Sequence, residues 1–268
     1  MNNAGFFKGL SLAWMLSKRD LKNRYAGSYA GIAWHIGVPL LYASINVAVF
    51  SILVGGRMGG GYENIPFALF YFVPFSIWIF FQETVNRSTG ILKEYSYLIN
   101  KISFPFWVLP LVPLASAFVN QVVILSIVAV LMAFYGIAPG ADAWGYLFVW
   151  MACLVFSLGV AYAVSALTVY VPDLSQIVPV IVNILYWLTP ILYPASLVES
   201  HGGRWAKAFI LEYNPFYYWA ELSRRSMFDM GVTFSADKAG FLIVISLVAL
   251  GVGALVFKKL KSGFADVL

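Results

Sequence analysis

Long apolar stretches alternate with short polar ones along the whole chain. Six of them are long enough for helices that cross a bilayer, whose apolar core requires about 20 residues per helix. They cover residues 30–55, 67–91, 106–135, 144–170, 177–193 and 239–257. Such continuous runs do not fit the alternating pattern of a membrane β-barrel, so their backbone polar groups must be satisfied within helices. The pattern predicts an all-α, polytopic membrane protein with six transmembrane helices.

The composition agrees with this pattern. Hydrophobic residues make up 61% of the chain and charged residues 11%, and the mean hydropathy is +0.82, all far from the values of soluble globular proteins. No stretch remains that is long enough for a soluble domain. We therefore expect one transmembrane domain over residues 1–268, made of a surface segment (1–28), a six-helix membrane region (30–257) and a short tail (258–268).

The charged residues outside the expected spans predict an orientation. With six spans, the side that holds both termini carries ten Lys or Arg against four Asp or Glu, a net charge of +6, whereas the other side carries six against seven, a net charge of −1. Because positive loops stay in the cytoplasm, both termini are expected to be cytoplasmic and the protein to lie in the inner (plasma) membrane. The overall charge of +5 then reflects topology and attraction to anionic membrane lipid, and no soluble basic surface remains for a nucleic acid.

Residues 1–28 predict an interfacial helix instead of a cleavable signal, because Lys8 interrupts their apolar part and a basic cluster follows. Large apolar side chains recur at helical spacing and basic ones occupy other faces, which is the pattern of a helix that lies along a membrane surface. Two interpretations remain open for it: a positively charged membrane anchor, or a contact with a cytoplasmic partner.

A short polar segment, which we call the knuckle (residues 93–101), separates the second and third expected spans on the cytoplasmic side. The spacing of its apolar residues predicts a short helix with one apolar face. That face comprises Tyr95, Leu98, Ile99 and Ile102. Pro105 then ends the helix, since proline lacks an amide proton and restricts the residue before it. A passive loop needs no apolar face, so we expect the knuckle to contact a partner.

The remaining loops differ between the two sides. Asp173 stands before the fifth span, where it is expected either to cap that helix through free backbone amides or to contact a partner. On the outer side, residues 189–231 are too apolar for a solvated loop and too interrupted to span. They predict outer-side re-entrant or interfacial helices, although their Trp and Tyr residues also fit an ordinary aromatic belt.

Ionisable groups inside a span are energetically unfavourable and are usually paired or face a polar cavity. Glu83 and Arg87 lie four residues apart near the cytoplasmic end of the second span. Either they form an intrahelical pair, or Arg87 joins Lys22 and Arg24 at a cytoplasmic entrance that binds lipid phosphate. Neither histidine lies among residues with metal-ligand spacing, so no metal site is expected.

Aromatic and amide side chains share helical faces in two spans. The first span carries Trp34, Tyr42 and Asn46, and the fifth carries Asn183, Tyr186 and Trp187. Flat aromatic rings stack on the C–H faces of sugars, and amide groups form hydrogen bonds with sugar hydroxyls. These two helical faces therefore fit the lining of a pathway for a sugar chain. Packing between helices is the alternative.

Four segments in order resemble one known family. They are "RDLKNRYAGSYAGIAWHIGVPLL", "LINKISFPFWVLPL", "PDLSQIVPVIVNILYWLTPILYP" and "NPFYYWAELSRRSMF". The chain resembles the membrane subunit of ABC-2 type exporters, in the branch that exports O-antigen, capsule and teichoic acid. Two positions depart from the family pattern: Ala30, often leucine there, and Pro172 before Asp173, where arginine is common. The second departure weakens an ionic role for that loop.

The resemblance implies a permease that moves a lipid-linked polysaccharide, O-antigen-like, out of the cytoplasm. It implies that the knuckle is a coupling helix on a separate ATPase, with two copies of each subunit. The docking residues would be Glu94, Tyr95, Leu98, Ile99, Lys101 and Asp173. The chain itself would be no enzyme, because it contains no G-x-x-x-x-G-K-[ST] phosphate loop, so ATP and Mg²⁺ would belong to the partner. Other exported substrates (capsule, teichoic acid, drug or haem) and a membrane-embedded glycan transferase are the alternatives.

Overall fold

The structure is a computed structural model that describes residues 3–24, 33–54, 61–99, 105–228 and 236–268, and these are helical with short connections. The longer helices are α1 (Asn3–Arg24), α2 (Ala33–Val54), α3 (Phe67–Ser88), α6 (Leu111–Tyr135), α7 (Trp144–Tyr170), α8 (Leu174–Leu188), α11 (Pro215–Met227) and α12 (Ala236–Leu260). The short ones are α4 (Ile91–Glu94), α5 (Ser96–Ile99), α9 (Ala195–His201), α10 (Arg204–Lys207) and α13 (Phe264–Val267), with the 3₁₀ turns η1 (Phe106–Val108) and η3 (Lys261–Gly263) and the π turn η2 (Ala208–Glu212).

Within the described residues, four helical stretches are long and apolar enough to cross a membrane. They are Phe67–Ser88, Phe106–Tyr135, Trp144–Tyr170 and Asp237–Gly263. Two shorter apolar stretches, Leu40–Leu53 in α2 and Leu174–Leu188 in α8, correspond to the first and fifth expected spans. The expected class, a polytopic α-helical membrane protein, is confirmed.

The fifth expected span ends earlier than its apolar pattern indicates. We expected residues 177–193, but α8 stops at Leu188 and Thr189 is extended, with φ −92° and ψ 134°. The cause is Pro190, because a proline disfavours helical geometry at the residue before it. The apolar residues beyond this break belong to a separate buried segment that includes Ile191 and Leu192.

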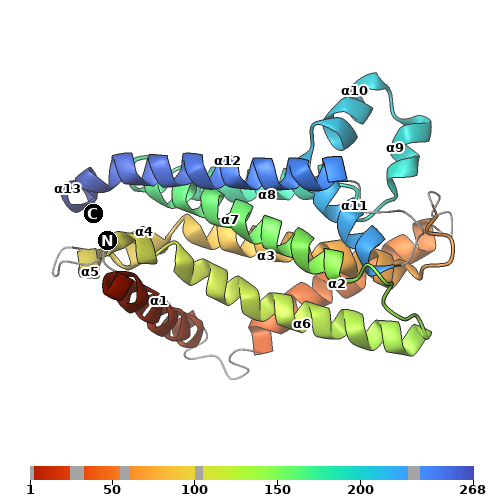
Figure 1. The fold of residues 1–268 in the computed structure, drawn as a ribbon, viewed down its shortest axis with the longest axis horizontal. Helices are drawn as coiled ribbons and strands as arrows, with labels where there is room; N and C mark the ends of the chain where they lie inside the picture. Colours follow the sequence, from red (N-terminus) through yellow and green to blue (C-terminus); the bar gives the residue numbers. More distant parts are fainter. Residues whose placement is uncertain (1–2, 25–32, 55–60, 100–104, 229–235) are drawn as a thin grey trace.

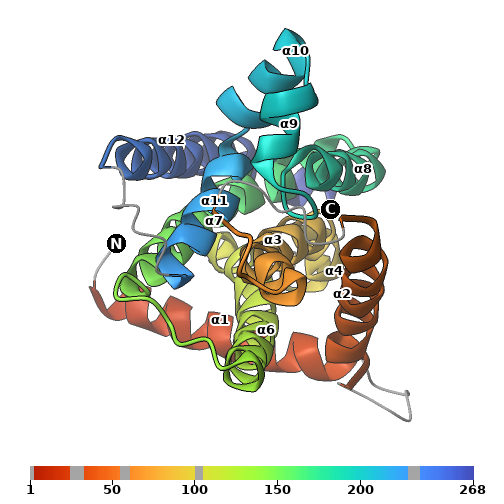
Figure 2. The ribbon, with the colours of Figure 1, turned by 90° about the vertical axis from the view of Figure 1, so that its right-hand side faces the viewer.

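The bundle is organised around α3, with α6, α7, α8, α11 and α2 packed about it (Figures 1 and 2). Aromatic residues such as Phe70, Tyr71 and Phe80 are fully buried on different faces of α3, as expected for a helix that is apolar all round. Helix α1 lies across the bundle axis (Figure 2), and both chain ends lie at this same end, which we call the terminal end (Figure 1). Helices α9 and α10 project from the opposite end.

Helices α7 and α12 cross at close range. A Cβ atom built on Gly159 would overlap the backbone of Ala249 and Leu250, and one built on Gly253 would overlap the backbone of Gly159. Small residues of this kind let two membrane helices approach each other closely. The α7–α12 pair therefore depends on these two glycines.

We expect Gly253→Val to destabilise the protein by about 1–3 kcal/mol, because the new side chain overlaps backbone atoms that have no room to move. Thermal unfolding of the detergent-purified protein measures the change. Gly251→Val is the matched control, since a Cβ at Gly251 meets no atom within 4 Å. Equal losses in both variants would contradict the close crossing.

Candidate functional site

The terminal end has its own apolar cluster, which joins four parts of the chain. Leu16 of α1 packs in it with Leu92 and Tyr95 of the knuckle region, Val169 of α7 and Phe264 of α13. Separate apolar clusters at one end of a bundle give that end its own packing unit. The knuckle thus packs against other parts of the same chain.

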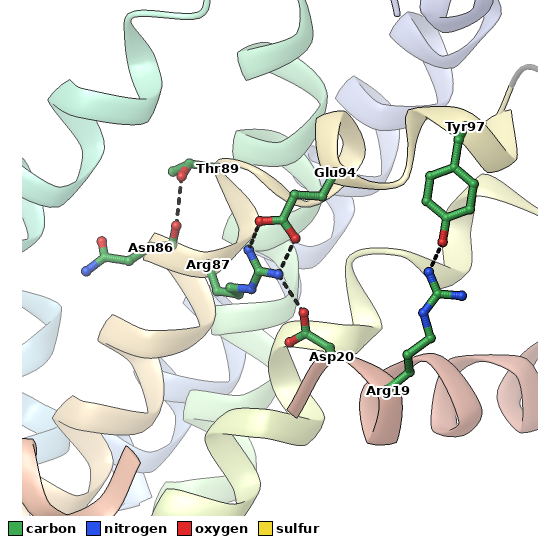
Figure 3. A network of polar contacts seen from close by, with 7 residues as sticks. All are labelled: Arg19, Asp20, Asn86, Arg87, Thr89, Glu94 and Tyr97. Atoms are coloured by element: carbon green, nitrogen blue, oxygen red, sulfur yellow. Dashed lines mark hydrogen bonds and ion pairs between the residues drawn. The ribbon is translucent and has the colours of Figure 1, made fainter. Parts of the chain in front are cut away.

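Arg87, in the last turn of α3, ties three elements together (Figure 3). Its guanidinium donates to both carboxylate oxygens of Glu94 on α4, and its Nη2 donates to Oδ1 of Asp20 on α1 at 2.5 Å. Asp20 is 4% exposed, so a charged partner is needed to stabilise it there. An arginine suits this position because its planar fork can serve two carboxylates at once.

The expected intrahelical pair of Glu83 with Arg87 is wrong. Arg87 bonds Asp20 and Glu94 instead, and Glu83 accepts a hydrogen bond from Asn120 on α6. The competing expectation, that Arg87 faces lipid phosphate, stays a prediction; in the structure the Nη1 and Nη2 groups of Arg87 donate to the two carboxylates.

A second bridge joins α1 to the knuckle. Arg19 donates a hydrogen bond to the hydroxyl of Tyr97 (Figure 3), and its guanidinium lies 5.9 Å from the ring of Tyr95 and 5.6 Å from that of Tyr97. Cation–π contacts of this kind strengthen when partly shielded from water. The knuckle is therefore attached to α1 by an ion-pair bridge and by an aromatic bridge.

The described part of the apolar face of the knuckle, Tyr95 and Leu98, packs inward. The knuckle region forms two helical turns, α4 and α5, that break at Tyr95. Tyr95 is only 5% exposed and Leu98 packs against the terminal cluster, so the expectation of a free apolar face is wrong for Tyr95. Burial also raises the pKa of the Tyr95 phenol. Among the knuckle side chains that the structure describes, Lys93, Glu94 and Tyr97 are exposed.

The other expected terminal-end residues are placed as follows. Lys22 and Asp173 are exposed, and Asp173 forms no side-chain cap hydrogen bond, so the capping interpretation is wrong. Its neighbour Ser175 bonds the carbonyl of Pro172 at 2.7 Å instead. Lys101, Ile102 and the side chains of Arg24 and Ile99 lie outside the described residues.

The expected pathway residues fall on two helices, α2 and α8, that meet through α3. Nδ2 of Asn46 lies 3.3 Å from the hydroxyl of Tyr71 and 3.4 Å from that of Tyr186, and the two hydroxyls are 3.0 Å apart. Trp34, Tyr42 and Trp187 are 51%, 68% and 53% exposed, and Asn183 is exposed as well. The structure thus brings Asn46 and Tyr186 together and leaves the other four at the surface of the single chain.

Comparison with known proteins decides the family. Residues 11–228 match the model of the ABC-2 type transporter family. The chain belongs to the ABC-2 type transporter family. It is 28% identical to the "O-antigen export system permease protein RfbA" of Myxococcus xanthus over 97% of this chain and 95% of that protein. Two proteins of the same name from Klebsiella pneumoniae are 25% and 26% identical, each over 99% of this chain and 97% of its own length. The expected family is therefore confirmed.

One buried residue of this ABC-2 permease domain, Arg224 on α11, is absent from the sequence expectations. It is 1% exposed and donates to the carbonyl oxygens of Phe70 (2.9 Å), Pro190 (2.8 Å) and Ile191 (2.8 Å). Its guanidinium also lies 3.6 Å from the centre of the Phe70 ring. Burial lowers the pKa of Arg224 to about 10, so the side chain remains charged at neutral pH.

Arg224 secures the end of α8 together with a second residue of α11. Asn214 donates to Oγ1 of Thr189 at 3.1 Å and caps its own helix by accepting from the amide of Phe216 at 3.0 Å. These bonds satisfy carbonyls and a hydroxyl that the break after Leu188 exposes. Two adjacent arginines, 224 and 225, in an apolar, aromatic segment were the sequence signal for a buried cation. The sequence pattern did not identify the carbonyl groups that accept its hydrogen bonds.

Proposed function

We propose that this chain is the permease subunit of an ATP-driven exporter that moves a lipid-linked, O-antigen-like polysaccharide from the cytoplasmic side across the inner membrane. The observation that carries the proposal is the ABC-2 family match together with relatives of nearly equal length that are named O-antigen export permeases. In this family the domain is a permease without ATPase function and generally pairs with an ATPase subunit.

The proposed topology has six transmembrane helices, with α2 and α8 added to the four long apolar stretches. Both termini lie at one end of the bundle, as an even number of spans requires (Figure 1). That end also bears the basic excess of the sequence, which supports a cytoplasmic location. The terminal end is then the cytoplasmic end, and α9 to α11 lie outside.

The proposed ATPase contact is the exposed side of the knuckle, together with Asp173, which follows the end of α7 that packs in the terminal cluster. Lys93, Glu94 and Tyr97 are exposed there, whereas Tyr95 and Leu98 pack in the apolar cluster of the terminal end. ATP and Mg²⁺ would bind the partner, since the printed sequence has no phosphate loop. The apolar inner face thus serves the attachment of the knuckle and the polar outer face serves the contact.

The proposed pathway lies between two copies of the chain along α2 and α8. Both helices expose large apolar side chains, including Tyr42 and Ile52 on α2 and Val180 and Trp187 on α8. Some of this surface faces lipid, but a two-fold pair of chains would line a central path with the aromatic and amide residues. Asn46 and Tyr186, which are half-buried, would supply an amide and a hydroxyl for sugar hydroxyls, and the buried Tyr71 holds them in place.

We expect Trp187→Ala to lower export of long glycan by about two- to tenfold, because one stacking ring contributes about 0.5–1.5 kcal/mol. Assembly with the ATPase should be unchanged, since Trp187 is half exposed in the single chain. Surface glycan and detergent-stable complex are measured in the same cells. Trp144→Ala, which removes a tryptophan that is 82% exposed on α7, is the control, and equal export in the two variants would contradict the pathway.

Affinity purification of the tagged chain from its native membrane tests the proposal. We expect a stoichiometric P-loop ATPase in the eluate and, in cells that lack the chain, accumulation of lipid-linked glycan inside. Absence of any such ATPase would contradict the proposal. If the ATPase is recovered but the amount of lipid-linked glycan inside cells that lack the chain is unchanged, the chain would be an exporter of another substrate.

A further inference from the structure

Two bridges connect α1 with the knuckle at the terminal end, and both pass through named side chains. The first is the ion-pair bridge Asp20–Arg87–Glu94 and the second is the contact of Arg19 with Tyr97 (Figure 3). We propose that α1, the last turn of α3 and the knuckle move as one body, and that Arg87 is the positioning residue that holds them together. This inference rests on the proposed function. It specifies which part of the chain would move when the ATPase acts on the knuckle.

The covalent path from α3 to the knuckle supports a single body. Only Thr89 and Gly90 separate α3 from α4, and both are bonded to the preceding turn: the hydroxyl of Thr89 donates to the carbonyl of Asn86 at 2.7 Å, and the amide of Gly90 donates to that of Arg87 at 3.4 Å. Neither residue is a loose linker. A force on the knuckle therefore acts directly on α3.

The path from the knuckle to α1 consists of side chains only. Asp20 is almost completely buried and its bond to Arg87 is partly shielded, which makes it a stronger link than an exposed pair. Leu16 of α1 and Tyr95 of the knuckle pack in the same apolar cluster. Gly9 in addition fixes α1 to η1, the turn that follows the knuckle along the chain, because a Cβ there would overlap the ring of Trp107. Ion pairs, rings and apolar packing thus connect the same two elements.

The consequence for transport follows from the place of α3 in the bundle. It is the most deeply buried long apolar helix, and its Tyr71 bonds Tyr186 of α8 and Asn46 of α2. Movement of α1, the last turn of α3 and the knuckle as one body would therefore be transmitted through α3 to both proposed pathway helices, α2 and α8. Coupling of this kind requires a packed element with discrete arrangements, which a buried helix provides better than a surface loop.

A crosslink tests whether α1 and the knuckle stay together during transport. Cys153 is the only cysteine of the chain and is buried, so Cys153→Ala gives a clean background. Arg19→Cys and Tyr97→Cys are combined in the full complex and joined by a bifunctional thiol reagent, with each single variant as control. We expect export to remain within about twofold of the same variant before crosslinking, the level of change usual for independent effects. A crosslink that abolishes export while the ATPase stays bound would overturn the proposal, because the two elements would then have to separate.

Arg87→Gln provides the second measurement. We expect the ATPase to remain bound and to hydrolyse ATP, while the ATP consumed per glycan exported rises about tenfold, within the range of ordinary coupling energies. Asp20→Asn should act through the same bridge, so the double variant should be no worse than Arg87→Gln alone. An unchanged ATP-to-glycan ratio in Arg87→Gln would overturn the inference. Failure of the unmutated chain to bind an ATPase would instead overturn the proposed function, so the two failures are distinguishable.

Discussion

Arg224→Met is expected to lower the stability of the protein by about 3–5 kcal/mol, the largest effect that we predict for a single side chain. The variant leaves three buried carbonyl oxygens without their charged donor and removes the guanidinium from the Phe70 ring. Thermal unfolding in detergent and the yield of folded protein measure the loss. Arg224→Lys should recover only part of it, because an ammonium group lacks the planar fork.

The neighbouring arginine is the matched control for this prediction. Arg225 is 29% exposed and pairs with Glu221, so Arg225→Met should cost about 1 kcal/mol or less. Similar losses at positions 224 and 225 would show that the three carbonyl contacts do not hold the end of α8.

Tyr95→Asp is expected to detach the knuckle and to reduce ATPase association by about 100-fold or more. A carboxylate in an apolar cluster costs several kcal/mol, and Tyr95 is 5% exposed within such a cluster. The membrane helices should remain folded, since the main apolar cluster does not include Tyr95. Pull-down of the ATPase at several concentrations and thermal unfolding of the permease separate the two effects.

Tyr95→Phe is the control, because it retains the buried ring. It should bind the ATPase as the unmutated chain does. Normal association of the Tyr95→Asp variant would mean that the ATPase contact does not depend on the knuckle.

The apolar pattern predicted the helices well because long apolar runs have few alternatives in a bilayer. The pattern located α3, α6, α7 and α12 within a few residues of their observed ends. It extended α8 too far, since hydropathy alone does not register the effect of Pro190 on Thr189. Helix breaks depend on backbone geometry, which hydropathy does not contain.

The candidate site was less predictable, for a physical reason. Periodicity showed that Tyr95 and Leu98 share a face, but it does not say what covers that face, and in the structure the chain covers it itself. The partners of Arg87 come from α1 and α4, and Asp20 lies 67 residues away from it in the sequence. Spacing within one helix indicated Glu83 instead. Long-range ion pairs are set by packing, which a single sequence does not display.

ATP-dependent transport in a purified system tests the central proposal most directly. Vesicles would contain this chain and its P-loop ATPase, with a labelled lipid-linked polysaccharide accessible on the ATPase side. We predict that the polysaccharide moves to the opposite side only with hydrolysable ATP. Movement that is equally fast without ATP, or no movement although the complex hydrolyses ATP, would contradict the assignment.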